Sequence, residues 1–374
     1  MNAGAGLRLR GMVRKEWLQV IRDPSSIAIA FVLPMLLLLI FGYGVSLDSK
    51  HIPIALVAEH PGPQSASFLG GFEQSPYFSP MTVPSMQEAE TLLRQNRVDG
   101  IVWLRDNFDR DYLRRDSPPI SVIVNGVDAN TGRLVEGYIQ AIWFGWLDRN
   151  AEMAGRKLRA PVELEQRIWF NPQVRSTDFL VPGVLAVIMT LIGALLTALV
   201  ITREWERGTM EALLVTRISV VELLLGKVIP YFVLGMGGLT LSLVMAKFLF
   251  HVPMRGSLWL LIATSALFLL VALGMGLFIS TLVRSQFVAA LVALVSTFLP
   301  AFILSGFIFD IQSMPLPIQG VTHLIAARYY VSILQTLFLV GDVWSVVLPN
   351  SAALLAMAVF FLGLVWRRTR KNLE

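Results

Sequence analysis

Long apolar runs alternate with short charged segments along this chain. A helix needs about 20 mostly apolar residues to cross the ~30 Å hydrocarbon layer of a membrane. Six runs reach this length, and none of them contains an acidic residue. They cover residues 27–47, 179–201, 229–250, 258–283, 287–309 and 346–366. The pattern predicts an α-helical membrane protein with six transmembrane helices.

The basic residues predict how these helices are oriented. Lys and Arg gather in residues 1–26, in the loop 202–228 and in the tail 367–374. Loops that stay in the cytoplasm are enriched in Lys and Arg. With six spans all three clusters fall on one side, so both termini should be cytoplasmic. We expect a multi-pass protein of the bacterial inner membrane.

A further apolar stretch, residues 316–340, competes for a place as a seventh span. Arg328 lies at its middle, and an arginine at the centre of a spanning helix costs ~2.5–3.5 kcal/mol on insertion scales. A seventh span would also place the basic C-terminal tail outside. We therefore expect 310–345 to be an external, re-entrant segment, and 179–366 to hold spans two to six.

Residues 48–178 interrupt the membrane pattern. They hold 14 Lys and Arg against 17 Asp and Glu, a net charge of −3, which favours an external location. Three β-branched runs predict strands, two other segments predict helices, and Pro, Gly and Ser between them predict a loop. The strands are 52–58, 98–104 and 120–125, the helices 85–97 and 131–150, and the loop 59–84. The order predicts an α/β extracytoplasmic domain between spans one and two.

The loop 202–228 is unusually rich in charge. Glu204, Arg207 and Glu211 share one helical face, Gly208 marks a break, and Ser219 begins a capping box. The loop therefore predicts two short helices under the membrane. Residues 1–26 predict an interfacial helix, because apolar and basic residues separate onto two faces. The apolar face holds Met12, Val13, Trp17 and Val20, and the basic face Arg10, Arg14 and Arg22.

Composition excludes several classes of function. The chain has no cysteine and four histidines, so disulfides and thiolate metal sites are absent and we predict no metal site. The net charge of +5 is explained by membrane topology, so we predict no nucleic-acid partner. A phosphate-binding loop needs two glycines and a Lys followed by Ser or Thr. The chain has Gly226 followed by Lys227, but Val221 stands where the first glycine is needed. Val228 stands where Ser or Thr is needed, so the pattern fails at two positions.

Several segments together resemble one family. REWERGTMEALLVTRISVVELLLGKVIPY (203–231) resembles the signature of the permease subunits of ABC-2 type transporters, in the drug-exporter branch with a large extracytoplasmic domain. Other segments resemble further parts of that family in the same order along the chain. They are KEWLQVIRDP (15–24), RIWFNP (167–172), STLVRSQFVAAL (280–291) and LSGFIFDIQSMP (304–315).

The resemblance implies a permease that binds no cofactor and is not itself an enzyme, with ATP and Mg on a cytosolic ATPase subunit. The charged segment would contact that ATPase, and the N-terminal helix would lie along the membrane. Implied coupling residues are Arg203, Glu204, Trp205, Glu206, Arg207, Gly208, Thr209 and Glu211, and implied interfacial residues are Lys15, Glu16 and Trp17. Aromatic and Met side chains suit a pathway for apolar ligands. The pathway candidates are Phe31, Met35, Phe298 and Phe302.

The implied function is efflux of a hydrophobic drug or a lipid-like substrate by a dimer of this chain with a second copy or a paralogue. Membrane lipids and a periplasmic adaptor are further candidate partners. Two other functions stay open at this stage. An ion-coupled carrier would place Asp, Glu or His inside the membrane, and the six apolar runs hold none. A membrane sensor with an extracytoplasmic domain would not need six spans. The motifs of membrane-anchored hydrolases are absent from the sequence.

Overall fold

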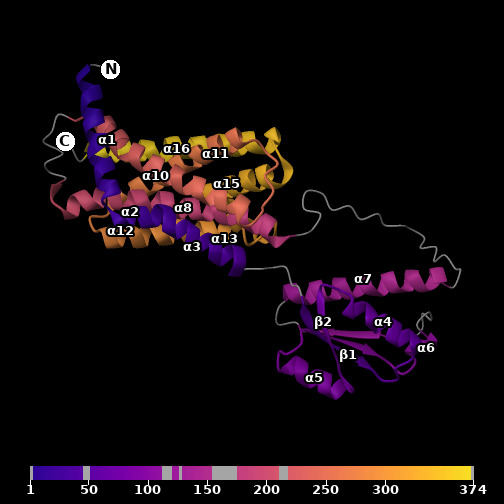
Figure 1. Ribbon diagram of the computed structural model, residues 1–374. Coiled ribbons are helices and arrows are strands. Elements are labelled where there is room, and N and C mark those ends of the chain that lie inside the picture. The colour runs from indigo at the N-terminus through magenta and orange to yellow at the C-terminus, as the bar shows by residue number, and fades with distance from the viewer. Residues whose placement is uncertain are drawn as a thin grey trace. The chain divides into compact units, whose positions relative to one another are not determined.

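The computed structural model describes residues 3–44, 51–111, 120–125, 129–153, 175–209 and 218–371. The chain divides into two units (Figure 1). Met1–Ser46 with Ile168–Glu374 form a helical unit, and Leu47–Arg167 form a second unit around a small sheet.

The helical unit contains, among the described residues, six helices that are long and apolar enough to cross a membrane. Each one overlaps a run that the sequence predicts, which confirms the six helices. The first comprises α2 (Pro24–Ile27), η1 (Ala28–Val32), α3 (Leu33–Leu39) and η2 (Ile40–Gly44). The others are α8 (Ser176–Glu206), α10 (Val220–Phe248), α11 (Leu258–Leu282), α12 (Gln286–Ala293) with η3 (Leu294–Phe298) and α13 (Leu299–Leu304), and α16 (Trp344–Lys371).

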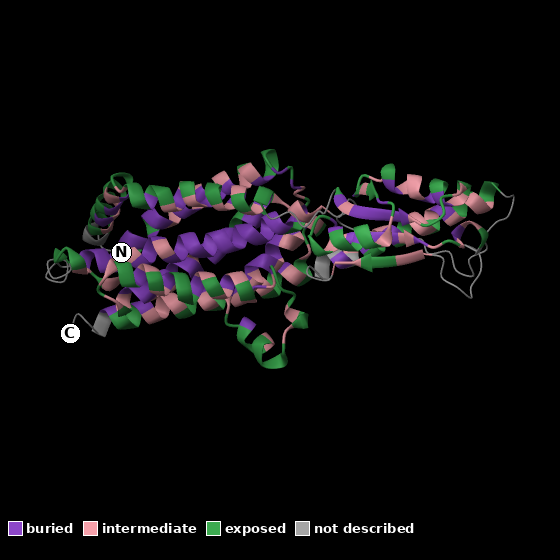
Figure 2. Cartoon of the chain, turned by 90° about the horizontal axis from the view of Figure 1, so that it is seen from below, coloured by how far each residue is buried: buried purple, intermediate pink, exposed green. Residues whose placement is uncertain are grey.

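Helix α8 is the core of this unit. Buried residues make up 89% of its apolar window, against 17% for α16, and Figure 2 shows the buried stretch running through the centre of the bundle. Small residues allow its close contact with α11. A Cβ on Gly276 would lie 2.3 Å from the carbonyl oxygen of Ala194, and one on Gly193 would lie 2.5 Å from the Cβ of Ala272. Helices in membranes pack in this way, through small residues and short backbone distances.

Two prolines follow π-helical turns in spans one and five. Proline has no N–H for the carbonyl four residues earlier. The residue before each proline donates its N–H to the carbonyl oxygen five residues earlier. These bonds run from Leu33 to Ala28 and from Leu299 to Leu294. The carbonyl oxygen of Ala30, which Pro34 leaves without its helical donor, lies where a Cβ on Gly238 would come within 2.3 Å. Only glycine fits at that point of α10.

The segment between spans five and six is sharply bent. It comprises η4 (Ile311–Ser313), α14 (Leu316–Thr322), α15 (Ala326–Gln335) and η5 (Thr336–Val340). The break between α14 and α15 turns the chain by 83°, which fits a broken span or a re-entrant loop. Tyr330 holds α15 in the bundle, because its ring stacks on Phe268 at 4.1 Å and its hydroxyl donates to Ser265 at 2.7 Å.

The second unit is an α/β fold, as predicted. Its sheet has the order β2-β1-β3-β4, in which β2, β1 and β3 are parallel and β4 is antiparallel to β3. Helices α4 and α7 cover one face and α5 covers the other (Figure 1). The strands are β1 (Ile52–Ala58), β2 (Phe78–Thr82), β3 (Gly100–Leu104) and β4 (Ile120–Val124), and the helices are α4 (Pro63–Glu73), α5 (Met86–Arg94), α6 (Phe108–Asp111) and α7 (Ala129–Met153).

The predicted loop 59–84 is wrong, because α4 and β2 lie within it. Phe68 and Phe72, one helical turn apart, are fully buried and pack edge to face at 5.3 Å. Asp109 accepts hydrogen bonds from the backbone N–H groups of Gln64 and Ser65 at the start of α4. Burial of aromatic side chains and this cap outweigh the Pro, Gly and Ser content that favours a loop.

Candidate functional site

Helix α1 (Ala3–Ile21) lies across the ends of α8 and α10 (Figure 1). Its buried face is formed by Met12, Glu16 and Val20, which are spaced four apart and are 4%, 1% and 2% exposed. A Cβ on Gly226 of α10 would lie 2.4 Å from the Cγ of Met12. The two helices therefore meet at a distance that only a glycine allows.

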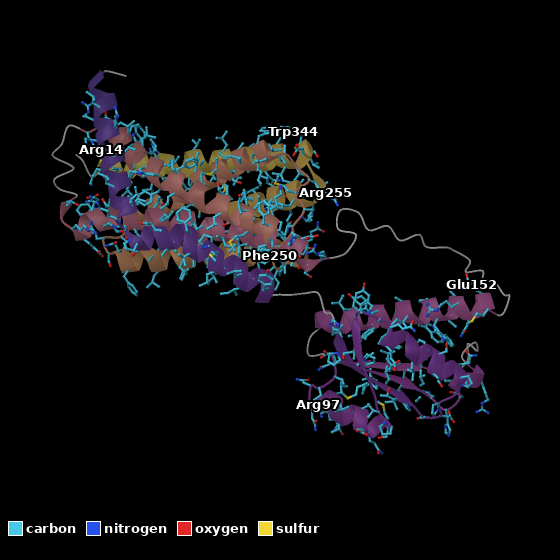
Figure 3. All side chains as sticks on the ribbon, viewed as in Figure 1. Arg14, Arg97, Glu152, Phe250, Arg255 and Trp344 are labelled. Atoms are coloured by element: carbon cyan, nitrogen blue, oxygen red, sulfur yellow. The ribbon has the colours of Figure 1, made fainter. Side chains whose placement is uncertain are left out.

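The apolar side chains of α1 divide between the bundle and the surface. Met12 and Val20 are buried in the bundle, whereas Trp17 is 38% exposed. Glu16 lies on the buried face of the helix, where it pairs with Lys227 of α10. The basic face is as predicted, with Arg14 exposed on the outer side of the helix (Figure 3).

A buried lysine lies at the centre of the site. Lys227 on α10 is 1% exposed. Its Nζ lies 3.0 Å from Oε1 of Glu16 and 3.2 Å from Oε1 of Glu204. Lys15 approaches the same oxygen of Glu204 at 2.8 Å. One carboxylate at the end of α8 thus holds cations from both α1 and α10.

A second ion pair joins α8 to the residues between α1 and α2. Nη2 of Arg203 lies 2.7 Å from Oδ2 of Asp23, which follows the end of α1. We call these six residues the ion-pair cluster: Lys15, Glu16, Asp23, Arg203, Glu204 and Lys227. Three cations face three carboxylates, so the cluster is neutral as a whole. Burial of charge is tolerated when each charge is paired in this way, whereas loss of one partner leaves an uncompensated buried charge.

Asp23 also fixes the entry into span one. Its carboxylate accepts hydrogen bonds from the backbone N–H of Ser25 at 3.2 Å and from the hydroxyl of Ser26 at 2.7 Å, at the start of α2. Burial raises the pKa of the Asp23 carboxyl, but the Ser26 hydroxyl and the Arg203 guanidinium outweigh it and hold the pKa below its ordinary value. The carboxylate therefore stays ionised in its ion pair.

The loop itself differs from its prediction. The capping box is confirmed, because Ser219 accepts from the N–H of Glu222 and Glu222 accepts from the N–H of Ser219. It begins α10 directly, and residues 203–206 are the last turn of α8. The predicted pair of separate short helices is therefore wrong for the described part of the loop. Glu222 also holds Arg8 of α1 at 2.9 Å.

The predicted coupling residues differ in exposure, and Trp205 is half-buried between a buried and an exposed group. Arg203 and Glu204 are 6% and 4% exposed and have partners inside the chain. The exposed group is Glu206, Arg207, Gly208 and Thr209. Gly208 has a φ of +67°, which confirms the predicted break. Glu211 lies outside the described residues, as does the resembling segment 167–172.

Three contacts hold the tip of α8. The Thr209 hydroxyl donates to the Glu204 carboxylate. Glu206 accepts from the backbone N–H of Gln286 at 2.6 Å, where α12 begins. Trp205 is half-buried, and the guanidinium of Arg284 lies over its ring at 4.9 Å. The tip of α8 is thus held against α12 as well as against α1 and α10.

Sequence reasoning missed Lys227 and Asp23. The sequence shows Lys227 only as part of a failed phosphate-binding pattern. The feature that could have identified Lys227 is its position just before the apolar run of the third span. A lysine buried at such a position needs a carboxylate partner. The structure places that lysine against Glu16 and Glu204. The described residues also contain no group of three or more side chains that could hold a metal ion.

The four predicted pathway residues do not form one group. Phe298 and Phe302 stack at 5.8 Å on span five, and Phe302 also meets Phe41 of span one at 5.8 Å. Phe31 lies against α10, where a Cβ on Gly237 would be 3.2 Å from its ring. Met35 is 47% exposed. Phe41, which the sequence analysis did not select, makes the aromatic contact between spans one and five.

Comparison with known proteins gives consistent matches. The family described as ABC-2 family transporter protein matches residues 24–367. The chain is 45% identical to the probable multidrug ABC transporter permease YbhS of Escherichia coli, over 98% of both chains. It is 27% identical to the probable multidrug ABC transporter permease YbhR of the same organism, over 89% of this chain and 90% of that one. It is 29% identical to the inner membrane transport permease YhhJ, over 91% and 93% of the two chains.

Proposed function

The chain belongs to the ABC-2 family of transporter proteins, and on that premise we propose that it is the permease subunit of an exporter whose ATP hydrolysis takes place on a separate subunit. The ion-pair cluster carries this proposal. It connects the last turn of α8, the central helix of the bundle, to α1 and α10. A force applied at the tip of α8 would therefore move three helices together.

The proposed contact with the ATPase differs from the one that the sequence predicts. Arg203 and Glu204 have their charges satisfied within the chain. Direct contact is therefore assigned to the exposed residues Glu206, Arg207 and Thr209, with Glu211 as a further candidate from the sequence. In this proposal Arg203 and Glu204 act as positioning residues, because they transmit the contact to the other helices. ATP and Mg would bind to the partner.

The orientation of the chain belongs to the same proposal. The N-terminal helix and the end of α16 lie at the same end of the helical unit as the ion-pair cluster (Figure 1). Because basic residues gather in these parts of the sequence, that end is assigned to the cytoplasm. The α/β unit then lies on the extracytoplasmic side, and the bent segment with α14 and α15 is a re-entrant element at the outer end.

The proposed substrate is a hydrophobic drug or a lipid-like molecule. Two of the relatives are named as probable multidrug permeases, and the described middle parts of the six spans carry apolar side chains with a few hydroxyls. A pathway between two permease copies, with Phe298 and Phe302 beside it, is assigned on this basis. An ion-coupled carrier would need a titratable relay in mid-membrane, and the membership of the family argues against it.

The test is co-expression with the ABC ATPase encoded by an adjacent gene. The two chains should purify together, and drugs should stimulate ATP hydrolysis after reconstitution in liposomes. Arg207→Glu should lower the yield of bound ATPase about tenfold or more, because it reverses a charge at the contact. Arg94→Glu is the matched control, since Arg94 is 83% exposed in the second unit. Equal ATPase recovery with the Arg207 and Arg94 variants would contradict the assigned contact, and no drug-stimulated hydrolysis would contradict the exporter.

A further inference from the structure

A polar pocket of about 630 Å³ lies at the end of the bundle opposite to the ion-pair cluster. Phe179, at the start of α8, lines the pocket, and Arg203 of the cluster lies 24 residues later, which is about 36 Å along a helix. The pocket is formed where α13 ends and where the bent segment meets α8 and α16. Gly306, with a φ of +83°, turns the chain out of α13 at its edge.

The positive charge in this pocket is an arginine with neutral hydrogen-bond partners. Arg328 is half-buried near the start of α15. Its Nη1 bonds the Gln319 carbonyl, the Thr322 hydroxyl and Nδ1 of His323. Within the described residues no carboxylate lies within ion-pair distance of Arg328. A guanidinium in this state keeps donors for a phosphate or carboxylate, which it binds in a bidentate geometry.

A second donor lies in the pocket, on Gln335. Nε2 of Gln335, one of the lining residues, is buried and has no hydrogen-bond partner among the described residues. A buried donor without an acceptor is destabilising, so a ligand that supplies oxygen atoms would remove this cost. Arg328 and Gln335 lie seven residues apart, two turns of α15 and on the same side of the helix.

The other lining residues indicate what the rest of the ligand should be like. Phe179, Val331, Leu339 and Val340 supply an apolar wall. Asp310 is also a lining residue, and its Oδ1 accepts from the backbone N–H of Gln312 at 3.1 Å as the cap of η4. This carboxylate weakens the attraction for an anion, but within the described residues it makes no ion pair with Arg328 and gives Nε2 of Gln335 no acceptor.

We propose that this pocket binds the anionic headgroup, phosphate or carboxylate, of an amphipathic molecule whose apolar part lies along Phe179 and Val331. Arg328 and Gln335 bind the oxygens of the headgroup. The site is separate from the predicted pathway residues, and its binding needs neither ATP nor the ATPase, so it goes beyond the proposed function and is tested independently of it.

The experiment measures binding to the purified full chain in a neutral detergent by native mass spectrometry. The probes are dioleoylphosphatidylglycerol, dodecyl phosphate, inorganic phosphate and zwitterionic dioleoylphosphatidylcholine. One or both of the amphipathic anions should bind more tightly than the other two probes. Binding of phosphatidylglycerol alone identifies a membrane lipid as the source, and binding of dodecyl phosphate identifies a single-chain amphiphile.

Removal of the Arg328 charge and removal of the Asp310 charge should have opposite effects on ligand affinity. Arg328→Gln should weaken binding of the anionic amphiphile about tenfold or more, because it removes a charge-assisted contact. Arg255→Gln is the control, since Arg255 is an exposed arginine at the same end of the bundle and does not line the pocket (Figure 3). Asp310→Asn keeps the cap of η4 and removes the like charge, so it should strengthen binding a few-fold.

Three results would overturn the proposal. They are equal affinity of the Arg328→Gln variant and the wild type, weaker binding by Asp310→Asn, and tightest binding of inorganic phosphate. If Arg328→Gln does not fold, as judged by size-exclusion chromatography, Arg328→Lys and Gln335→Leu replace it. Both should then weaken binding of the anionic amphiphile relative to Arg255→Gln, and unchanged affinity in both would equally refute the site.

Discussion

Charged side chains near the two ends of α8 have different kinds of partner. At one end the ion-pair cluster sets three cations against three carboxylates, and Lys227 at its centre is 1% exposed. At the other end Arg328 bonds a carbonyl, a hydroxyl and an imidazole nitrogen. The first arrangement is complete within the chain and joins helices. The second leaves donors for a molecule from outside.

The difference follows from the cost of burying charge. A buried ion must be paired, and removal of one partner costs more than the pair contributes, since the other charge is left in a medium of low polarity. The ion-pair cluster should therefore be sensitive to single substitutions, whereas the exposed tip of α8 and the outer pocket should tolerate them. The following experiments test that contrast on the purified protein, from the largest expected change in stability to the smallest.

Lys227→Met should have the largest effect. The substitution keeps much of the length of the side chain but removes the buried cation that Glu16 and Glu204 share, and leaves them Lys15, which is 44% exposed. Loss of one partner of a buried pair costs about 3–5 kcal/mol. The free energy of unfolding is measured by denaturant titration in mixed micelles. Lys247→Met, an exposed lysine on the same helix, is the control, and equal effects of the two changes would show that the cluster adds no stability.

Gly226→Leu tests the close contact of α1 with α10. The new side chain would meet Met12, which lies 2.4 Å from the position of a Cβ on Gly226. Overpacking of this kind costs about 1–3 kcal/mol. Gly363→Leu on α16 is the control, because a Cβ there has no neighbour within 4 Å. Thermal unfolding and limited proteolysis of the N-terminal helix report the result, and unchanged protection of α1 would contradict the close contact.

Asp23→Asn should have a smaller effect that depends on pH. The Asp23 side chain is 19% exposed, against 1% for Lys227, so the loss of its ion pair should cost less than that of Lys227, about 1 kcal/mol. The pKa of Asp23 lies below its ordinary value, so its contribution is present above the unfolded-state pKa of about 4 and is lost as the pH falls through the folded-state pKa. The difference in melting temperature between wild type and variant should be constant near neutral pH and should shrink in acid. A difference that grows in acid would reverse the assigned sign.

Arg207→Gln should have the smallest effect on stability. Arg207 is exposed one turn beyond Arg203, and a surface substitution changes stability by about 0.5 kcal/mol or less. Arg203→Gln, which unpairs Asp23, is the matched comparison on the same helix. In the proposed function Arg207 makes the direct contact with the ATPase, so Arg207→Gln should weaken ATPase binding more than Arg203→Gln does. A larger loss of stability with Arg207→Gln than with Arg203→Gln would contradict the division of the tip into buried and exposed groups.

The second unit shows where local sequence signals fail. Ser85 caps α5 as predicted, since its hydroxyl accepts from the N–H of Glu88, and this contact spans three residues. Helix α4 and strand β2 were missed because their stability comes from Phe68, Phe72 and Phe78, which pack against α7 and β3 far along the chain. A segment rich in Pro, Gly and Ser is structured here by contacts that its own composition does not contain.

The sequence by itself determined the six long apolar helices, the positions of the charged segments between them and the family. These features depend on runs of consecutive residues, because a membrane selects for continuous apolar length and places basic loops on one side. The tertiary structure alone decided which charges meet. Lys15, Glu204 and Lys227 are far apart in sequence, and their contact depends on α1 crossing α8 and α10 where Gly226 admits Met12. Pairing of buried charge is a property of helix packing, and packing distances are not contained in local sequence pattern.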